Sequence, residues 1–197
     1  MIARSETLQA RKQQLVKEAI WDAAIDLFVA KGFDEATVEE IARAAGVSRR
    51  SFFRYFASKK DLMAQGVLLY GATLRGAIEA CARSYTLLET MERVTLEVAK
   101  HTASQPRTRQ IYRIAESSMA ANEALLSSLP AVEVDLSEAF EARLKKASKD
   151  LLKPRLLAAL TLAILNTSLQ HWCRNEPEDI SIVIRQAFAT ISQVVCQ

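Results

Sequence analysis

Apolar residues recur at helical spacing along almost the whole chain, and the first clear case lies near its start. Positions three and four residues apart give one apolar face to a helix, and they are Val16, Ile20, Ala23, Ala24, Leu27 and Phe28. Gly32 is a natural end for this helix, because glycine adopts the left-handed conformation of a helix C-terminus without a Cβ clash. No alternation typical of a strand lasts longer than about three or four residues. The pattern predicts an all-α fold.

Capping residues divide the next stretch into shorter helices. A serine or threonine that precedes a helix accepts a hydrogen bond from its first turn, and an acid three residues later completes a capping box. The expected caps are Thr37 (with Glu40), Ser48 and Ser58 (with Asp61), and the expected helices span about 38–45, 49–55 and 58–83. Gly46 breaks the chain between the first two. Gly66, Gly71 and Gly76 lie inside the third, which indicates either close packing or a compliant helix that transmits movement.

The remaining signals predict five more helices, about nine in all. Thr86 with Glu89 begins one that runs to about 103. A helix over about 104–128 follows and is expected to end at Pro130, and Asp135 with Glu138 is expected to cap another that runs to about 149. Pro154 marks the first turn of the next helix, and the segment 177–179 begins the last.

Composition is typical of a soluble, helix-rich protein. Half of the 197 residues are apolar and a quarter are charged, with five glycines and four prolines. Three widely spaced cysteines (Cys81, Cys173 and Cys196) indicate reduced thiols and a cytoplasmic protein rather than a disulfide framework. The first 15 residues lack the apolar core of a signal sequence. The uncharged run 156–173 is too polar for a membrane span and is interpreted as a buried or interface helix, so no membrane partner is expected.

Charge is distributed unevenly, although the net charge is only +3. Between Arg43 and Lys60 every charged residue is basic, and these residues are Arg43, Arg49, Arg50, Arg54, Lys59 and Lys60. Elsewhere acids and bases are mixed. A local excess of one sign favours a polyanionic partner. The alternative is an ordinary solvated helix face.

Two short helices joined by a turn with glycine describe a helix-turn-helix. Phe52 and Phe56 give the second of these helices a core face, and the basic residues point elsewhere. Arg49 and Arg50, near its start, are placed to contact guanine edges in the major groove of double-stranded DNA. Ser51 occupies the position where the neighbouring helices carry an acid. The absence of a carboxylate there suits a helix that faces phosphates.

Hydroxyl and basic side chains around this helix are candidate phosphate ligands. The predicted phosphate contacts are Thr37, Ser48, Ser51, Arg54, Tyr55 and Lys59. The segment 1–12 is polar and contains Arg4, Arg11 and Lys12. It is either a loose terminus or a basic arm that touches DNA beside the main contact.

The first third of the chain resembles a known protein family. Residues 20–62 closely resemble the amino-terminal domain of the TetR (tetracycline-repressor-like) family, through AIDLFVAKGFDEATVEEIARAAGVS and FFRYFASKKDL. The resemblance implies a DNA-binding domain over 1–57 and an effector-binding and dimerisation domain over 58–197, with the helix 58–83 between them. It adds Phe53 to the base contacts. Phe53 stands where the family usually has tyrosine and Tyr55 where histidine is frequent, and the SFFRYF variant resembles the branch that includes mycofactocin-system regulators.

The second part of the chain is expected to hold an effector and to dimerise. Polar or bulky residues on its helices are candidate pocket residues, with ordinary core or surface roles as the alternative: His101, Tyr112, Glu116, Met119, Phe140, Asn166, Gln170 and Trp172. Two broad apolar helix faces near the C-terminus predict a homodimer interface, with burial inside one subunit as the alternative. The residues assigned to it are Leu157, Leu160, Ile164, Ile184, Phe188 and Ile191.

These features favour a ligand-responsive, dimeric transcriptional regulator. It is expected to be a repressor that a small, mainly apolar effector releases from a palindromic operator. The competing hypothesis is a helical protein-interaction module that no longer binds DNA. An enzyme is not expected, because the sequence carries no GxSxG, P-loop, HExxH or dinucleotide-binding motif. No cofactor, catalytic residue or metal ligand is assigned.

Overall fold

The computed structural model describes residues 8–144, 152–175 and 179–195, and the regular structure in these ranges consists of ten α-helices. The helices are α1 (Leu8–Lys31), α2 (Val38–Ala44), α3 (Arg49–Tyr55), α4 (Lys59–Ala80), α5 (Leu87–Ser104), α6 (Thr108–Ser117), α7 (Met119–Leu126), α8 (Leu129–Arg143), α9 (Leu152–Arg174) and α10 (Ile180–Val195). The all-α prediction is confirmed. One helix more than the expected nine is present.

The extra helix comes from a break at Ser118. The backbone of this residue is extended, and its hydroxyl accepts a hydrogen bond from the Ala121 N–H (3.1 Å), so it ends α6 and caps α7. The single helix expected over 104–128 is therefore wrong. Pro130 does not end a helix either, because it lies in the first turn of α8, where a missing N–H costs nothing.

Asp135 and Glu138 lie inside α8 and do not cap it. Both instead face α4, where Arg75 Nη1 lies 3.1 Å from the Glu138 carboxylate and 3.7 Å from that of Asp135. The predicted continuation of this helix to 149 is wrong, because α8 ends at Arg143 and the backbone of Leu144 is extended. The predicted role of Pro177 falls outside the described residues. Asp179 does begin α10, since its carboxylate accepts from the Ser181 N–H (2.9 Å).

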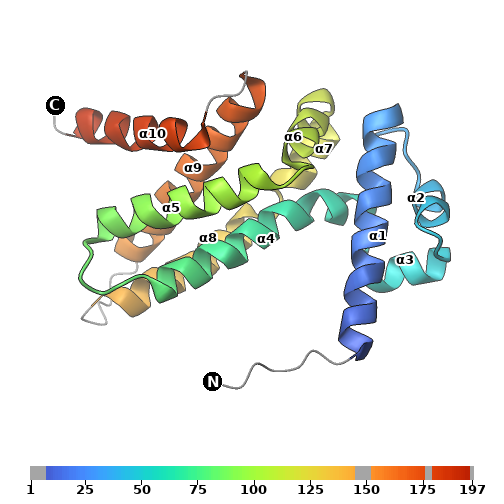
Figure 1. Cartoon of the computed structure of the whole chain (residues 1–197), viewed down its shortest axis with the longest axis horizontal. Helices are drawn as coiled ribbons and strands as arrows, with labels where there is room; N and C mark the ends of the chain where they lie inside the picture. Colours follow the sequence, from blue (N-terminus) through green and yellow to red (C-terminus); the bar gives the residue numbers. More distant parts are fainter. Residues whose placement is uncertain (1–7, 145–151, 176–178, 196–197) are drawn as a thin grey trace.

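The chain divides in space into a small end and a larger helical body (Figure 1). Helices α1–α3 form the end on the right of the view, and α4 runs from α1 into the body, where it packs against α5, α7 and α8. Gly71 permits the close approach of α4 to α8, because a Cβ there would lie 2.5 Å from Val132 Cγ1. The core is continuous from Ile20 in α1 to Phe188 in α10.

Helix α9 holds the long uncharged run and is long and apolar enough, by length and composition, to cross a membrane. Half of its apolar window is buried, and it packs against α8, α10 and α5 as a core helix does. Cys173 on this helix is a free thiol whose pKa is raised to about 11, chiefly because burial disfavours the thiolate. Cys81 is also free, and Cys196 lies outside the described residues.

Candidate nucleic-acid interface and cavity

A capping box fixes the start of α2 against α1. The Thr37 hydroxyl accepts from the Glu40 N–H (3.3 Å), and the Glu40 carboxylate accepts from the Thr37 N–H (3.0 Å). Lys31, at the end of α1, donates to the same carboxylate (2.7 Å). The hydrogen bond from Lys31, followed by those from Thr37, lowers the pKa of Glu40 to about 2. The predicted capping box is present, and it ties α2 to α1.

The turn between α2 and α3 follows the prediction from the sequence. Gly46 has φ of +67°, a left-handed conformation that residues with a Cβ rarely adopt. Ser48 caps α3, because its hydroxyl accepts from the Ser51 N–H (3.0 Å). Phe52 is fully buried and packs against Phe56, with ring centroids 6.0 Å apart. The helix-turn-helix is thus held by its core face, and the opposite face of α3 is left to solvent.

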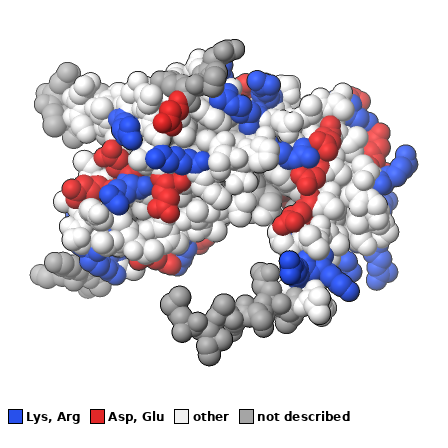
Figure 2. Space-filling model, in the orientation of Figure 1, with Lys and Arg blue, Asp and Glu red and all other residues white. Residues whose placement is uncertain are grey.

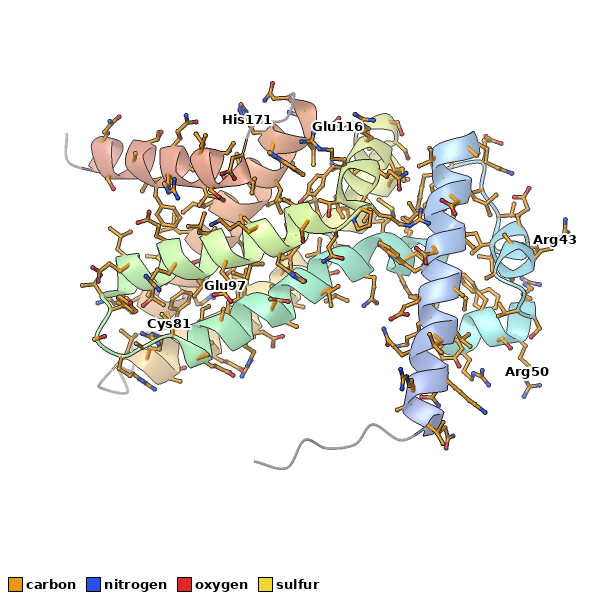
Figure 3. The ribbon with its side chains drawn as sticks, in the orientation of Figure 1. Arg43, Arg50, Cys81, Glu97, Glu116 and His171 are labelled. Carbon is orange, nitrogen blue, oxygen red and sulfur yellow. The ribbon has the colours of Figure 1, made fainter. Side chains whose placement is uncertain are left out.

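Basic side chains project from this end of the molecule. Figure 3 shows Arg43 on α2 and Arg50 on α3, and both point away from the rest of the protein. Both are exposed, and neither forms an ion pair with another described residue. Lys and Arg gather along the outer and lower edges of the α1–α3 end (Figure 2). The arrangement offers unneutralised positive charge beside α3.

Arg49 differs from Arg50 because it is paired. Its Nε lies 2.9 Å from the carboxylate of Glu39 on α2, and its guanidinium lies 5.4 Å from the centroid of the Phe53 ring. This ion pair was not predicted from the sequence, because Glu39 precedes the basic run that begins at Arg43. The turn between α2 and α3 brings Glu39 close to Arg49 only in the folded chain. Both partners are more than half exposed, so the pair contributes about 0–1 kcal/mol and a stronger anionic or guanine ligand can displace it.

The other residues proposed to contact DNA from α3 are exposed or half-buried. The side chain of Phe53 is 45% exposed. Arg54 donates to the Tyr55 hydroxyl (2.9 Å), which leaves the tyrosine its own hydrogen to donate. Ser51 accepts a hydrogen bond from the Ser48 hydroxyl (3.0 Å) and likewise keeps its own hydrogen. The hydroxyl of Thr37 is already engaged with Glu40 (2.8 Å).

Lys59 is placed differently from the prediction. Its ammonium group donates to the carbonyl oxygens of Phe33, Asp34 and Ala36 at 2.7–3.0 Å and lies 4.8 Å from the centroid of the Phe33 ring. Three donors are all that a lysine has. The geometry therefore argues against the phosphate contact and makes Lys59 a residue that fixes the α1–α2 loop to the start of α4.

The structure also differs from the predicted basic arm. Helix α1 begins at Leu8, so Arg11 and Lys12 lie on its first turns as exposed helical residues rather than on a flexible arm. Arg4 lies outside the described residues. The start of α1, on which they lie, is at the same end of the molecule as α3 (Figure 1).

A cavity of about 430 Å³ lies between α1, α4 and the junction of α5 with α6, and we call it the α1–α4 cavity. Of the eight residues predicted to line a pocket, His101 and Tyr112 line this one. Asn166 does not line it, but its side-chain oxygen accepts from the Tyr112 hydroxyl (3.4 Å). Gln170 is half-buried on α9 and does not line the cavity.

The other predicted pocket residues have structural or surface positions. Phe140 is completely buried in the core, and Met119 is 81% exposed on α7. Glu116 forms a surface ion pair with Arg174. Trp172 lies under Arg109, whose guanidinium carbon is 3.8 Å from the ring centroid. Their predicted pocket role is wrong for the α1–α4 cavity, because helical spacing alone does not tell which face turns inward.

Residues of α1 form one wall of this cavity but were not among the predicted pocket residues; they include Lys17, Trp21 and Asp22. Tyr70 on α4 and Arg107 before α6 also line the cavity and were not predicted. No local signal identifies these residues. They meet because α1 crosses the start of α4 and contacts α6.

The residues predicted for a dimer interface fall into two groups. Ile164 on α9 and Ile184 and Phe188 on α10 are buried where α10 packs on α5 and α9, which agrees with the alternative of burial inside one subunit. Leu160 is exposed, and Leu157 and Ile191 are half-buried. All of these except Ile184 line an apolar groove of about 310 Å³, together with Leu87, Leu88 and Met91 of α5.

Comparison with known proteins identifies the small end of the molecule. Residues 20–65 match the family model described as bacterial regulatory proteins, tetR family. The chain is 26% identical over 191 residues, 94% of both chains, to MftR of Mycobacterium tuberculosis, a protein assigned as a mycofactocin biosynthesis transcriptional regulator. Residues 20–65 are assigned to the DNA-binding domain of the TetR family. They comprise α2 and α3 with the parts of α1 and α4 that hold them.

Solved structures extend the likeness to the whole TetR-family fold. A TetR-family regulator from Syntrophomonas wolfei superposes with a TM-score of 0.67 at 20% identity, over 93% of this chain and 96% of that one. FadR of Thermus thermophilus, a TetR-family repressor solved with lauroyl-CoA, gives 0.50 at 23% identity over 88% and 91%. At these identities the likeness concerns the fold. Within the described residues, no group of three or more His, Cys, Asp or Glu side chains could hold a metal ion.

Proposed function

We propose that this regulator binds a palindromic DNA operator as a cytoplasmic homodimer, represses the genes beside it, and is released by a small, mainly apolar effector. Arg50 and Arg49 read guanine edges in the major groove, and Phe53 contacts a base through its exposed ring. Ser48, Ser51, Arg54 and Tyr55 hold the phosphates on either side. Two copies related by a two-fold axis present two α3 helices to successive major grooves, about 34 Å apart.

The observation that carries this proposal is the solvent face of α3. Arg50 is exposed without an ion pair among the described residues, and Arg49 has only a weak, exposed one. Unneutralised arginines at the start of a helix fit the phosphate-lined major groove better than any apolar protein surface. The assignment of residues 20–65 to this family and the exposed Phe53 ring support the same proposal.

The dimer part of the proposal is supported by apolar side chains that one subunit leaves in solvent. Leu156 and Leu160 lie one helical turn apart on α9 and are 51% and 43% exposed. The apolar groove lined by Leu160 adjoins them. An exposed leucine stripe beside a groove of the same chemistry suits a second copy packed across a two-fold axis.

The effector part is supported by the α1–α4 cavity, whose volume is within the range of about 300–1,000 Å³ that small-molecule sites occupy. Lauroyl-CoA, the compound bound to the repressor from Thermus thermophilus, is a first effector to test because its acyl chain is apolar.

A titration with DNA tests the function directly. A duplex selected by the wild-type protein from a random pool is labelled and followed by fluorescence anisotropy. Binding is expected with a Kd of about 10⁻⁸ M or tighter that weakens steeply with salt, because each phosphate contact releases counterions. Failure to select any duplex, with stable recovery of a protein partner instead, would favour the interaction-module hypothesis.

A further inference from the structure

Arg49 is held on two sides in the folded protein, although it lies on the solvent face of α3. Its Nε lies 2.9 Å from the carboxylate of Glu39 on α2, and its guanidinium carbon lies 5.4 Å from the centroid of the Phe53 ring. Helix α2 packs against α3 at this end of the molecule (Figure 1). We call Glu39, Arg49 and Phe53 the Arg49 triad.

The Phe53 ring is supported from inside the protein. It meets the Phe52 ring edge to face, with centroids 5.4 Å apart and an interplanar angle of 83°. Phe52 is completely buried in the core. Arg49 and Phe53 are four residues apart, so they lie one above the other on the same side of α3. The ring is therefore an anchored wall beside the guanidinium.

The ion pair with Glu39 leaves the terminal nitrogens of Arg49 available. The closest approach to the carboxylate is made by Nε, on the side of the guanidinium nearest the stem. A guanine accepts two hydrogen bonds, at O6 and N7, and the two terminal nitrogens of an arginine can donate both end-on. Glu39 and a guanine can thus hold the same guanidinium at once. Arg50 has no ionic partner among the described residues, so of these two arginines Arg49 alone is pre-oriented.

The position of the Phe53 ring favours contact with the base pair next to that guanine. Successive base pairs are about 3.4 Å apart along the axis of the duplex. The 5.4 Å between the Arg49 guanidinium carbon and the ring centroid is longer than one such step and shorter than two. The apolar group that a phenylalanine meets in the major groove is the C5-methyl group of thymine. A guanine with a thymine beside it is therefore the step that fits both side chains.

The carboxylate of Glu39 is otherwise unfavourable at this place. It is exposed in the first turn of α2, beside a face that offers positive charge to a polyanion. Its charge repels phosphates and so weakens binding to every duplex alike. Specificity is a difference between affinities. A residue that lowers nonspecific binding and also orients a base-reading arginine therefore raises specificity.

We infer that Glu39 is a positioning residue for Arg49, and that the Arg49 triad reads a guanine together with the methyl group of an adjacent thymine. Glu39 itself contacts no base. It limits the orientations of the guanidinium before DNA arrives, and Phe53 supplies the apolar contact. This inference rests on the proposed function, because it names a base step within the operator that α3 recognises.

Competition titrations of the selected duplex, and of every single base-pair substitution in its half-site, test the positioning role. Arg49→Ala should remove discrimination at one guanine, which identifies the base that Arg49 reads. At that base Glu39→Gln should lower the preference for guanine over adenine by about 2-fold to 5-fold, the range set by an exposed ion pair, and leave the other positions unchanged.

Glu35→Gln is the matched control for Glu39→Gln. It removes the same charge from an exposed site before α2 that has no ion pair among the described residues. Both variants should bind a duplex of unrelated sequence more tightly, because each loses a negative charge at the DNA-binding end. Glu35→Gln should keep the wild-type preference for guanine. An equal preference in the two variants overturns the positioning role.

Replacement of the adjacent thymine by uracil tests the second half of the inference, because it removes the methyl group alone. The wild type should bind the uracil duplex about 2-fold to 4-fold more weakly, the value of one methyl group withdrawn from water. Phe53→Ala should bind the two duplexes equally. A selected half-site without a thymine beside this guanine, or a uracil effect that persists in Phe53→Ala, overturns the thymine assignment.

Nitrogen-15 relaxation of the arginine Nε–H groups tests the restraint on Arg49 without DNA. In the free wild-type protein Arg49 should be less mobile than Arg50 on the picosecond-to-nanosecond timescale, and Glu39→Gln, but not Glu35→Gln, should reduce this difference. If this holds and no duplex is selected, the restraint stands, and the proposed function fails together with its base step. If duplexes bind specifically and Glu39→Gln behaves as Glu35→Gln does, the proposed function stands and the positioning role is wrong.

Discussion

Arg107 donates from Nη1 to Asp26, 81 residues earlier in the chain, over 2.7 Å, and so joins the helical body to the helix that carries the DNA-binding end. The hydrogen bond from Arg107 lowers the pKa of Asp26 below its ordinary value, so the carboxylate stays ionised at neutral pH. Asp22 lies at the same distance from the Arg107 Nε. One guanidinium thus holds two successive turns of α1.

Removal of this guanidinium should loosen α1 without disturbing the core. Arg107→Met keeps most of the apolar stem and removes all donors, so amide hydrogen exchange in α1 should accelerate relative to exchange in α9. Arg75→Met is the matched control, because Arg75 also pairs with two acids of another helix, Asp135 and Glu138, but joins α4 to α8 inside the body. Unchanged exchange in α1 of Arg107→Met, or equal acceleration in Arg75→Met, would contradict a coupling role.

Low pH should lower the stability of the DNA-binding end, because Glu40 becomes protonated. Its pKa is about 2 in the folded protein against 4.5 ordinarily, so the stability it contributes is fully present above pH 4.5 and is lost as the pH falls towards 2. Thermal unfolding followed from pH 6 to pH 2 should show a stability difference between wild type and Glu40→Gln that shrinks through this window. Glu97→Gln, at an exposed site without an ion pair among the described residues, serves as the control. A stability difference between wild type and Glu40→Gln that does not depend on pH would contradict this interpretation.

The contact between α4 and α8 should tolerate no added methyl group at Gly71. A Cβ there would lie 2.5 Å and 2.8 Å from the two γ carbons of Val132, so Gly71→Ala should lower the free energy of unfolding by about 1–3 kcal/mol. Gly76→Ala has open space and should raise it by about 0.5–1 kcal/mol. Urea denaturation at one protein concentration measures both. The double variant Gly71→Ala, Val132→Ala should recover part of the loss, and no recovery would place the strain elsewhere.

A charged residue in the exposed leucine stripe of α9 should dissociate the proposed dimer into single chains. Sedimentation equilibrium should give the wild type twice the chain mass of 21.9 kDa and should give Leu160→Glu the mass of one chain, because burying a carboxylate in an apolar interface is costly. Met119→Glu changes an even more exposed apolar residue, on α7, and should remain dimeric. A wild-type protein that sediments as a single chain at micromolar concentration is incompatible with the proposed interface.

Local chemistry explains which features could be predicted from the sequence. The capping boxes at Thr37 and Thr86, the left-handed glycines at 32 and 46 and the serine cap of α3 all involve neighbours within a few residues, and all are present as predicted. The prediction that Pro130 ends a helix was wrong, because proline fits the first turn of a helix as well as the position beyond its end.

Contacts between distant segments could not be predicted in the same way. The approach of Glu39 to Arg49 depends on the angle of the turn, and the three carbonyl groups that hold Lys59 converge only in the folded loop. The burial of Ile184 and Phe188 depends on which helix α10 meets. The wall that α1 contributes to the cavity arises from the crossing of α1 and α4, which no spacing within either helix encodes.

The central claim is that α3 reads DNA, and the most direct test compares arginine variants in anisotropy titrations of the selected duplex. Arg50→Ala and Arg49→Ala should each weaken binding by about 5-fold to 150-fold, corresponding to about 1–3 kcal/mol for a lost guanine contact. Arg113→Ala, which removes an exposed arginine of α6, should bind as the wild type does. If Arg49→Ala and Arg50→Ala bind the duplex as tightly as the wild type and Arg113→Ala do, α3 is not the recognition helix.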